Sequence, residues 1–191
     1  MSVRPLRELR RDHPAFFRAV AADARTSLAY RSEPFDFVSK TRLCAQIVRL
    51  TWVSDAFLAQ VMYRAKARLQ YFRIPIVPTL LHRLAMMHSQ VCIGSPVVIQ
   101  PGIYIAHGQV IIDGYVTIAQ GVVIFPFVNI GLKAGNFQGP TVNNGVHIGT
   151  GAKVIGPITV GEGAVIGANA VVVSNVEVGQ TVGGVPARPL R

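Results

Sequence analysis

Residues 142–172 read VNNGVHIGTGAKVIGPITVGEGAVIGANAVV, and this stretch decides the fold. Glycine or a small polar residue usually follows an isoleucine or valine that recurs at every sixth position: Val142, Ile148, Val154, Val160, Ile166 and Val172. An amphipathic helix cannot keep one face with a period of six, and an alternating strand needs no glycine at each step. Three six-residue sides close a triangular prism, with aliphatic residues pointing inward and glycines turning the corners. The pattern therefore predicts a β-helix.

The same period extends beyond this stretch in both directions. It continues downstream at Val178 and upstream at a series of isoleucines: Ile93, Ile99, Ile105, Ile112, Ile118, Ile124 and Ile130. The step from Ile105 to Ile112 is seven residues long, and Asn136 takes an aliphatic place. Counting Asn136, the chain holds fifteen units, or about five coils. Because such a prism leaves flat faces with exposed ladders, we expect a homotrimer of prisms packed side by side.

The composition changes sharply near residue 90. All 18 glycines lie beyond residue 93, whereas residues 1–90 hold fifteen of the 19 basic residues and six of the 9 acidic ones. This change predicts two units, an α-helical segment over 1–90 and a β-helix with a C-terminal tail over 91–191. In the first unit, apolar residues at helical spacing predict amphipathic helices, with Ser54-Asp55 as a break or cap and a last helix over Thr79–His88.

Composition also limits the class of protein. Half of the residues are hydrophobic and only 15% are charged, which excludes a disordered chain. Cys44 and Cys92 are too few for a disulfide framework, and no signal peptide is recognisable, so a cytoplasmic protein is expected. The basic helices carry no nucleic-acid readout motif. They are interpreted first as an oligomerisation face, and second as a peripheral contact with the anionic inner face of a membrane.

Three motifs resemble the serine acetyltransferase branch of the hexapeptide-repeat acyltransferases. They are Ile-Ala-His-Gly at 105–108, Ile-Gly-Thr-Gly-Ala-Lys at 148–153, and Gly-Gly-Val-Pro-Ala-Arg at 183–188. The resemblance implies a left-handed parallel β-helix and an acetyl-CoA-dependent O-acetyltransferase that needs no metal. It also implies that His107 is the general base and that the backbone N–H near Gly131 stabilises the oxyanion.

The chain departs from the pattern of that family at three positions around the expected acceptor. The family has aspartates at the places of Cys92 and Ala106, and a histidine in the loop before Pro140, where this chain has Gly139. Asp113 is the carboxylate nearest to His107 in the sequence, so it is either a replacement partner or a turn former. These changes favour a sugar hydroxyl of a polysaccharide or glycolipid precursor as the acceptor. The alternatives are a serine O-acetyltransferase of cysteine biosynthesis and a non-catalytic scaffold.

The remaining candidates concern coenzyme A and the acceptor. Two basic side chains and three backbone amides are expected to bind phosphate groups: Lys153 and Arg188, with Gly151, Ala152 and Gly167. Lys133 lies in a stretch, Lys133–Thr141, that loses the repeat and is interpreted as a protruding loop reaching the coenzyme. Larger side chains interrupt the pattern of small residues at Phe125, Phe127 and Asn129. They predict either an acceptor pocket or packing between subunits.

Overall fold

The computed structural model describes residues 11–33 and 39–190. Its helices are α2 (Phe16–Tyr30), α3 (Lys40–Val53), α4 (Asp55–Tyr71) and α5 (Val77–Ser89). Ser54 separates α3 from α4, and its hydroxyl accepts a hydrogen bond from the backbone N–H of Phe57, as expected of a cap. The last helix begins two residues before the predicted start at Thr79. Pro78 is tolerated there because the first turn of a helix needs no N–H from it.

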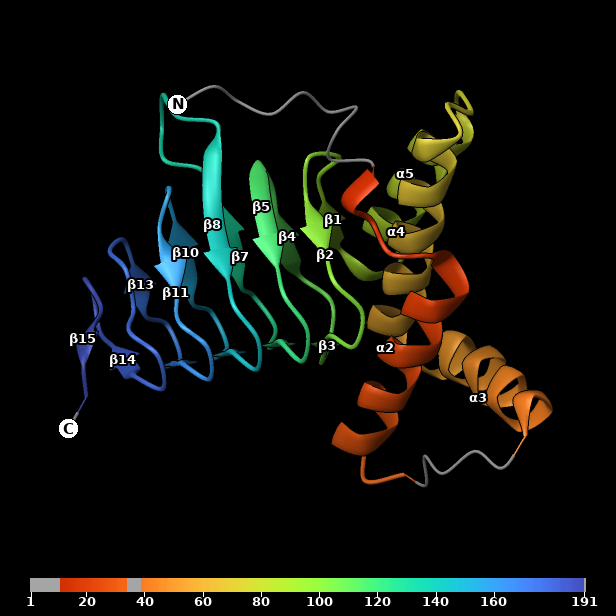
Figure 1. Ribbon diagram of the computed structural model, residues 1–191, viewed down its shortest axis with the longest axis horizontal. Coiled ribbons are helices and arrows are strands. Elements are labelled where there is room, and N and C mark those ends of the chain that lie inside the picture. Colours follow the sequence, from red (N-terminus) through yellow and green to blue (C-terminus); the bar gives the residue numbers. More distant parts are fainter. Residues whose placement is uncertain (1–10, 34–38, 191) are drawn as a thin grey trace.

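Short strands follow directly from Val91 and wind into three parallel sheets (Figure 1). Sheet A contains β1 (Val91–Ile93), β4 (Val110–Ile112), β7 (Asn129–Gly131), β10 (Lys153–Ile155) and β13 (Val171–Val172). Sheet B contains β2 (Val98–Ile99), β5 (Tyr115–Ile118), β8 (Gln138–Val142) and β11 (Thr159–Val160). Sheet C contains β3 (Tyr104–Ile105), β6 (Val123–Ile124), β9 (His147–Ile148), β12 (Val165–Ile166) and β14 (Thr181–Gly183), with β15 (Arg188–Pro189) antiparallel at its edge. From β1 to β13, each strand pairs with the third strand along the chain, and β14 continues sheet C beside β12. The predicted β-helix of about five coils is therefore confirmed.

The aliphatic column fills the prism, but two of its predicted members are wrong. Asn136 is exposed in a loop, and Val178 is 75% exposed. The loop inserts extra residues between Ile130 and Val142, which are consecutive sides of the coil. In the last coil the chain takes a four-residue step from Val172, so that the buried Val176 and then Val182 replace Val178. The number of coils is unchanged, because the unit predicted at Asn136 is lost and a unit at Val182 is gained.

The parallel register stacks the turns of successive coils into three edges. We call the edge where sheet C turns into sheet A the C–A edge; its turns are 106–109, 125–128, 149–152 and 167–170. One residue in each turn has a positive φ, with values of 64° at Gln109, 64° at Phe127, 75° at Gly151 and 55° at Asn169. The corner therefore demands the left-handed conformation, which glycine adopts most readily, yet glycine supplies it only once here.

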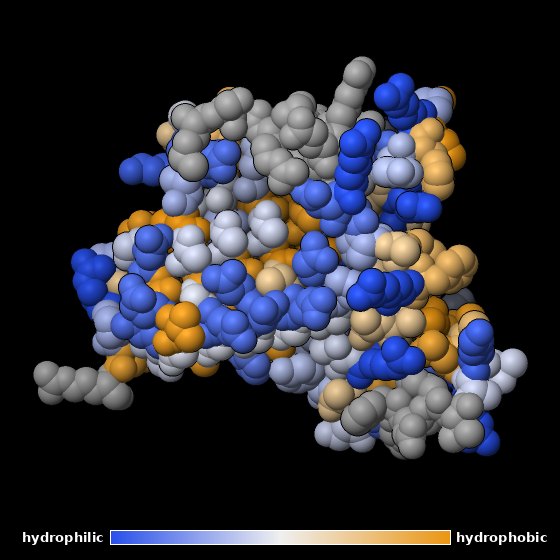
Figure 2. Space-filling view, viewed as in Figure 1, coloured by the Kyte–Doolittle hydropathy of each residue, from blue (hydrophilic) through white to orange (hydrophobic). Residues whose placement is uncertain are grey.

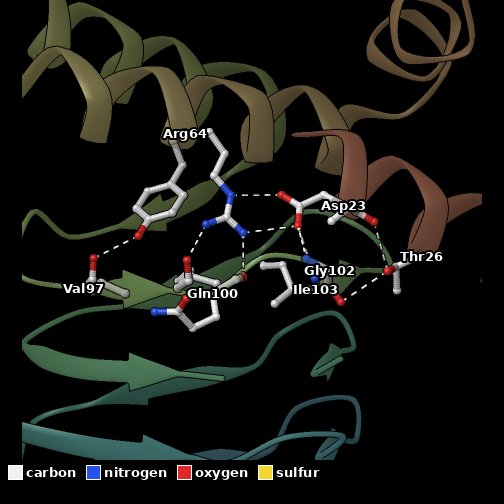
Figure 3. A network of polar contacts seen from close by, with 10 residues as sticks. Asp23, Thr26, Arg64, Val97, Gln100, Gly102 and Ile103 are labelled. Atoms are coloured by element: carbon white, nitrogen blue, oxygen red, sulfur yellow. Dashed lines mark hydrogen bonds and ion pairs between the residues drawn. The ribbon is translucent and has the colours of Figure 1, made fainter. Parts of the chain in front are cut away.

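A buried polar network joins the helices to the first coil (Figure 3). The Asp23 carboxylate of α2 accepts hydrogen bonds from Arg64 of α4, at 2.9 and 3.2 Å, and from the amides of Gly102 and Ile103, at 2.8 and 3.2 Å. Arg64 also donates to the carbonyl oxygens of Ile99 and Gln100. Asp23 and Arg64 are almost fully buried. The helices thus seal the end of the prism by satisfying the polar backbone groups of its first turn.

The surface of the helical end is mixed in character. Figure 2 shows hydrophilic side chains over most of the face in view, with apolar side chains exposed over the helices as well. Trp52 and Met87, both on helices, are 90% and 81% exposed. Within residues 11–33 and 39–190, no helix is long and apolar enough to cross a membrane.

Candidate active site

His107 lies on the C–A edge, in the first turn after β3, with its side chain exposed. Between the paired positions Ile105 and Ile111 the chain has five residues, 106–110, whereas the later turns have four, so the first turn bulges where the later turns do not. Gly108 has no room for a side chain, because a Cβ atom there would overlap the carbonyl oxygen of Ser89 at the end of α5. That same carbonyl accepts a hydrogen bond from the amide of Gln109, at 3.1 Å. The bulge therefore packs against α5, and His107 lines a pocket of about 300 Å³ between the coil and the helices.

A second pocket of about 430 Å³ continues from the first along the C–A edge. Gln90 and Gln109 line both pockets. Farther along, the second pocket is lined by Phe127, Asn129 and Lys153. We call the two pockets together the edge groove. It brings four of the predicted site residues into one continuous hollow, with His107 at one end and Lys153 toward the other.

The other residues predicted to bind the coenzyme follow the same edge. Coils stack about 4.8 Å apart, so the turn with Gly167 lies about 14 Å from the turn with His107. Arg188 pairs with Gly183 one coil farther on and bonds only to its own neighbour, the carbonyl of Ala187, within the described chain. Lys153 Nζ donates to the carbonyls of Phe127 and Gly151, at 3.1 and 2.8 Å. An extended ligand lying along the edge groove would meet this ammonium group.

The backbone amides predicted to bind phosphate are already engaged. Gly151 N–H donates to Pro126, Ala152 N–H to Gly149, and Gly167 N–H to Val182, at distances of 2.8 to 3.1 Å. These donors hold the turns of the coils together, and their binding to phosphate stays a prediction.

Several predicted residues lie away from the groove of their own chain. Gly131 and Asp113 sit where sheet A turns into sheet B, at the other end of sheet A from His107, and the Asp113 carboxylate covers Gly94. Asp113 is therefore no partner for His107. Lys133 is on the same far edge, and the predicted loop is shorter than Lys133–Thr141 because β8 resumes at Gln138. Phe125 is 38% exposed but does not line either pocket. Within one chain, Gly131, Asp113 and Lys133 cannot reach the atoms next to His107, whereas Phe125 lies one coil from Ala106 on the C–A edge.

Cys92 belongs to a different group of side chains, under the helices. Lys66 of α4 is buried, and its Nζ donates to the carbonyl of Ile93. Burial lowers the pKa of Lys66 to about 8, and burial followed by the charge of Lys66 lowers the pKa of His82. Burial, then the charge of Asp113, raises the pKa of the Cys92 thiol, which keeps it neutral at pH 7. Cys92 thus cannot supply the negative charge of the aspartate found at its place in the family.

The lowered pKa of Lys66 predicts a pH-dependent stability. Between pH 8 and 10 the folded protein releases this proton while the unfolded chain, with an ordinary lysine pKa of 10.5, retains it. The unfolded state then binds more protons, so the free energy of unfolding rises with pH. Compared with Lys66→Met, the wild-type protein should gain about 2 kcal/mol of stability from pH 7.5 to 10, as measured by urea unfolding. A difference between the two proteins that does not vary with pH would contradict the assignment.

Two titratable residues of the His107 pocket were not predicted as site residues. They are Asp55, the first residue of α4, and His88, in the last turn of α5. In the sequence, Ser54-Asp55 is interpreted as a helix boundary, and Asp55 is one of four unassigned aspartates of the helical segment, with Asp12, Asp23 and Asp36, that could supply a carboxylate for serine. His88 is interpreted only as the end of a helix. Their approach to His107 depends on how helices pack on the coil, for which the sequence offers no periodic signal. Among the described residues, no group of three His, Cys, Asp or Glu side chains is placed to hold a metal ion.

Known proteins match both the sequence and the fold. No family model matches the chain. A serine acetyltransferase from Synechococcus elongatus is 36% identical over 139 residues, a match that covers 69% of this chain and 55% of the relative's length. The soybean serine acetyltransferase apoenzyme is 28% identical, with a TM-score of 0.77 over 93% of this chain and 69% of that one. A serine acetyltransferase in complex with CoA is also 28% identical, with a TM-score of 0.74 over 96% of this chain and 72% of that one.

The fold is therefore a left-handed hexapeptide-repeat β-helix, and a helical segment seals its first coil. More particularly, the chain is similar in sequence and in fold to serine acetyltransferases, and the resemblance found in the sequence is confirmed. The chain spans only about half the length of the Synechococcus relative.

Proposed function

We propose that the protein is an acetyl-CoA-dependent serine O-acetyltransferase. The edge groove carries this proposal, because it joins a histidine at one end to a lysine at the other in a chain related to enzymes of that name. A solved relative is a complex with CoA, which supports acetyl-CoA as the acyl donor. A non-catalytic scaffold would need the coils but would have no use for this groove.

In the proposed reaction, His107 takes the proton from the acceptor hydroxyl as its oxygen attacks the thioester carbonyl. A C–O bond forms, a tetrahedral oxyanion collapses, and the C–S bond breaks to release the thiolate of coenzyme A. The proton held by His107 then passes to that thiolate. Because His107 is exposed in an open pocket, both substrates have access to it. The oxyanion contact through Gly131 stays a prediction. Within one chain Gly131 is too far from His107, so this contact requires a neighbouring prism.

Serine replaces the glycan as the preferred acceptor. The glycan interpretation depended on the loss of aspartates at Cys92 and Ala106, since an ammonium group needs a negative partner. The relatives are named for serine, and none of those described above is named for a glycan. Thiol release from acetyl-CoA in the presence of L-serine, of N-acetylglucosamine, or of no acceptor tests this choice. Release above the background with the sugar but not with serine would overturn the proposal.

The position of Lys153 predicts its effect on coenzyme binding. Replacing it with methionine should weaken CoA binding about tenfold, which is the scale of a charged hydrogen bond to a phosphate. Calorimetric titration with CoA and with dephospho-CoA measures the loss and shows whether the 3′-phosphate is the partner. Lys40→Met, on exposed α3, is the matched control and should bind CoA as the wild type does. Unchanged affinity in Lys153→Met would remove this contact from the account.

The assembly and the location remain predictions. We further propose the homotrimer, since the flat sheet faces of one prism suit the faces of another, and light scattering can measure the mass in solution. The cytoplasmic location is proposed from composition alone. Contact with a membrane has no support from these relatives and is not part of the proposal.

A further inference from the structure

The pocket around His107 takes its polar side chains from the helices as well as from the coil. Eight residues line it: Asp55, Met87, His88, Ser89, Gln90, His107, Gly108 and Gln109. Five of these come from the start of α4 and the end of α5 or just beyond it. Asp55 is the only carboxylate among the eight. The helical segment thus contributes charge to a pocket whose histidine belongs to the coil.

The Asp55 carboxylate faces the bulge next to His107. Its Oδ2 lies 3.4 Å from the point where a Cβ atom of Gly108 would be. Gly108 is in the seven-residue step of the repeat, and it presses against the end of α5 through Ser89. The bulge that carries His107 is therefore the part of the coil that lies next to Asp55. This proximity follows from packing and not from the repeat.

The Asp55 carboxylate has no hydrogen-bond or ion-pair partner in the described part of the chain, and its position in the first turn of α4 favours its negative charge. The cap of α4 is made by the neighbouring Ser54, whose hydroxyl accepts a hydrogen bond from the backbone N–H of Phe57. No residue in 11–33 or 39–190 hydrogen-bonds to the Asp55 carboxylate or forms an ion pair with it. The side chain is half-buried at the pocket wall. A carboxylate in this position is available to a ligand that enters beside His107.

We propose that Asp55 recognises the ammonium group of the acceptor and so makes the pocket specific for an amino alcohol such as serine. This inference rests on the proposed function. A buried ammonium group without a partner is unfavourable by several kcal/mol, and Cys92, Ala106 and Gly139 offer no charge. Asp55 supplies that charge from the helical segment, with the acceptor bridging its ammonium group to Asp55 and its hydroxyl to His107. The polar part of the site has thus moved from the coil to the helix.

The test compares acceptors that carry the ammonium group with one that lacks it. L-Serine and ethanolamine carry both a hydroxyl and an ammonium group, whereas 3-hydroxypropanoate lacks the ammonium. Asp55→Asn should raise KM about tenfold or more for the first two, with a smaller change in kcat, and leave 3-hydroxypropanoate unaffected. Asp55→Glu, which keeps the charge, should recover part of the loss. Glu162→Gln, an exposed residue of the coil, is the control and should change none of the values.

Two outcomes would overturn the assignment. Equal losses for all three acceptors would show that Asp55 acts on His107 or on the fold, and no loss would show that it does not contact the acceptor. If the wild-type protein transfers acetyl groups to none of them, the proposed function fails separately. Calorimetric binding of L-serine then decides: affinity that drops at least about tenfold in Asp55→Asn supports the assignment, and equal or absent binding overturns it.

Discussion

Replacing His107 by alanine is expected to lower the rate of acetyl transfer to L-serine by a factor of about 100 to 10,000. This is the usual contribution of a positioned general base, because without it the attacking hydroxyl must lose its proton to water. His107 lies in the only turn of the C–A edge that carries an extra residue, and its pocket holds room for an acceptor. Initial rates of thiol release at saturating acetyl-CoA measure the effect.

The control for this variant is His147→Ala. His147 lies on sheet C, where its Nε2 is 3.3 Å from the Tyr30 hydroxyl, and it lines neither pocket of the edge groove. Its loss should leave the rate within about twofold of the wild type. His107→Ala should still bind CoA, since the lysine at the other end of the groove is intact. A rate in His107→Ala close to that of the wild type would remove the histidine from the mechanism.

Replacing Asp23 by alanine is expected to lower the free energy of unfolding by about 3–5 kcal/mol. The variant leaves the Arg64 guanidinium buried without its counter-charge, and it also leaves the amides of Gly102 and Ile103 without an acceptor (Figure 3). Removing one member of a buried pair is far more destabilising than removing one from the surface. Urea unfolding followed by circular dichroism measures the change.

The matched control is Glu33→Gln, which breaks a pair between Glu33 and two arginines, Arg31 and Arg49. Those arginine side chains are 35% and 44% exposed, so the loss should be at most about 1 kcal/mol. If Asp23→Ala costs no more than this control, the network does not hold the helices on the prism. A loss confined to the helical signal would show that the coils fold without it.

The prism could be predicted because its signal is repeated. Each six-residue step places an aliphatic side chain inward, so errors occurred only where the chain length between sides changes. Asn136 kept the period in sequence but lies in an inserted loop, and Val178 kept it in a coil that shortens. The hydrophobic period does not show where a strand begins or ends, or where a loop is inserted, because these depend on how the backbone turns between sides.

The groove could be predicted in part, for the same reason. His107 and Lys153 share an edge because both follow sheet C in the order of the repeat, so their alignment was implicit in the spacing. The use of the Gly151 and Gly167 amides within the coils depends on hydrogen bonds between coils, which the motif does not reveal. Asp55 is 52 residues from His107 in the sequence, and only the packing of α4 and α5 on the first coil brings it near.

Direct identification of the product tests the central claim, that this groove transfers an acetyl group to serine. Purified protein would be incubated with acetyl-CoA labelled in the acetyl group and with L-serine, and the products analysed by mass spectrometry. The account predicts labelled O-acetylserine in amounts equal to the free coenzyme A released. Coenzyme A release without labelled O-acetylserine, or no release at all from the wild-type protein, would contradict it.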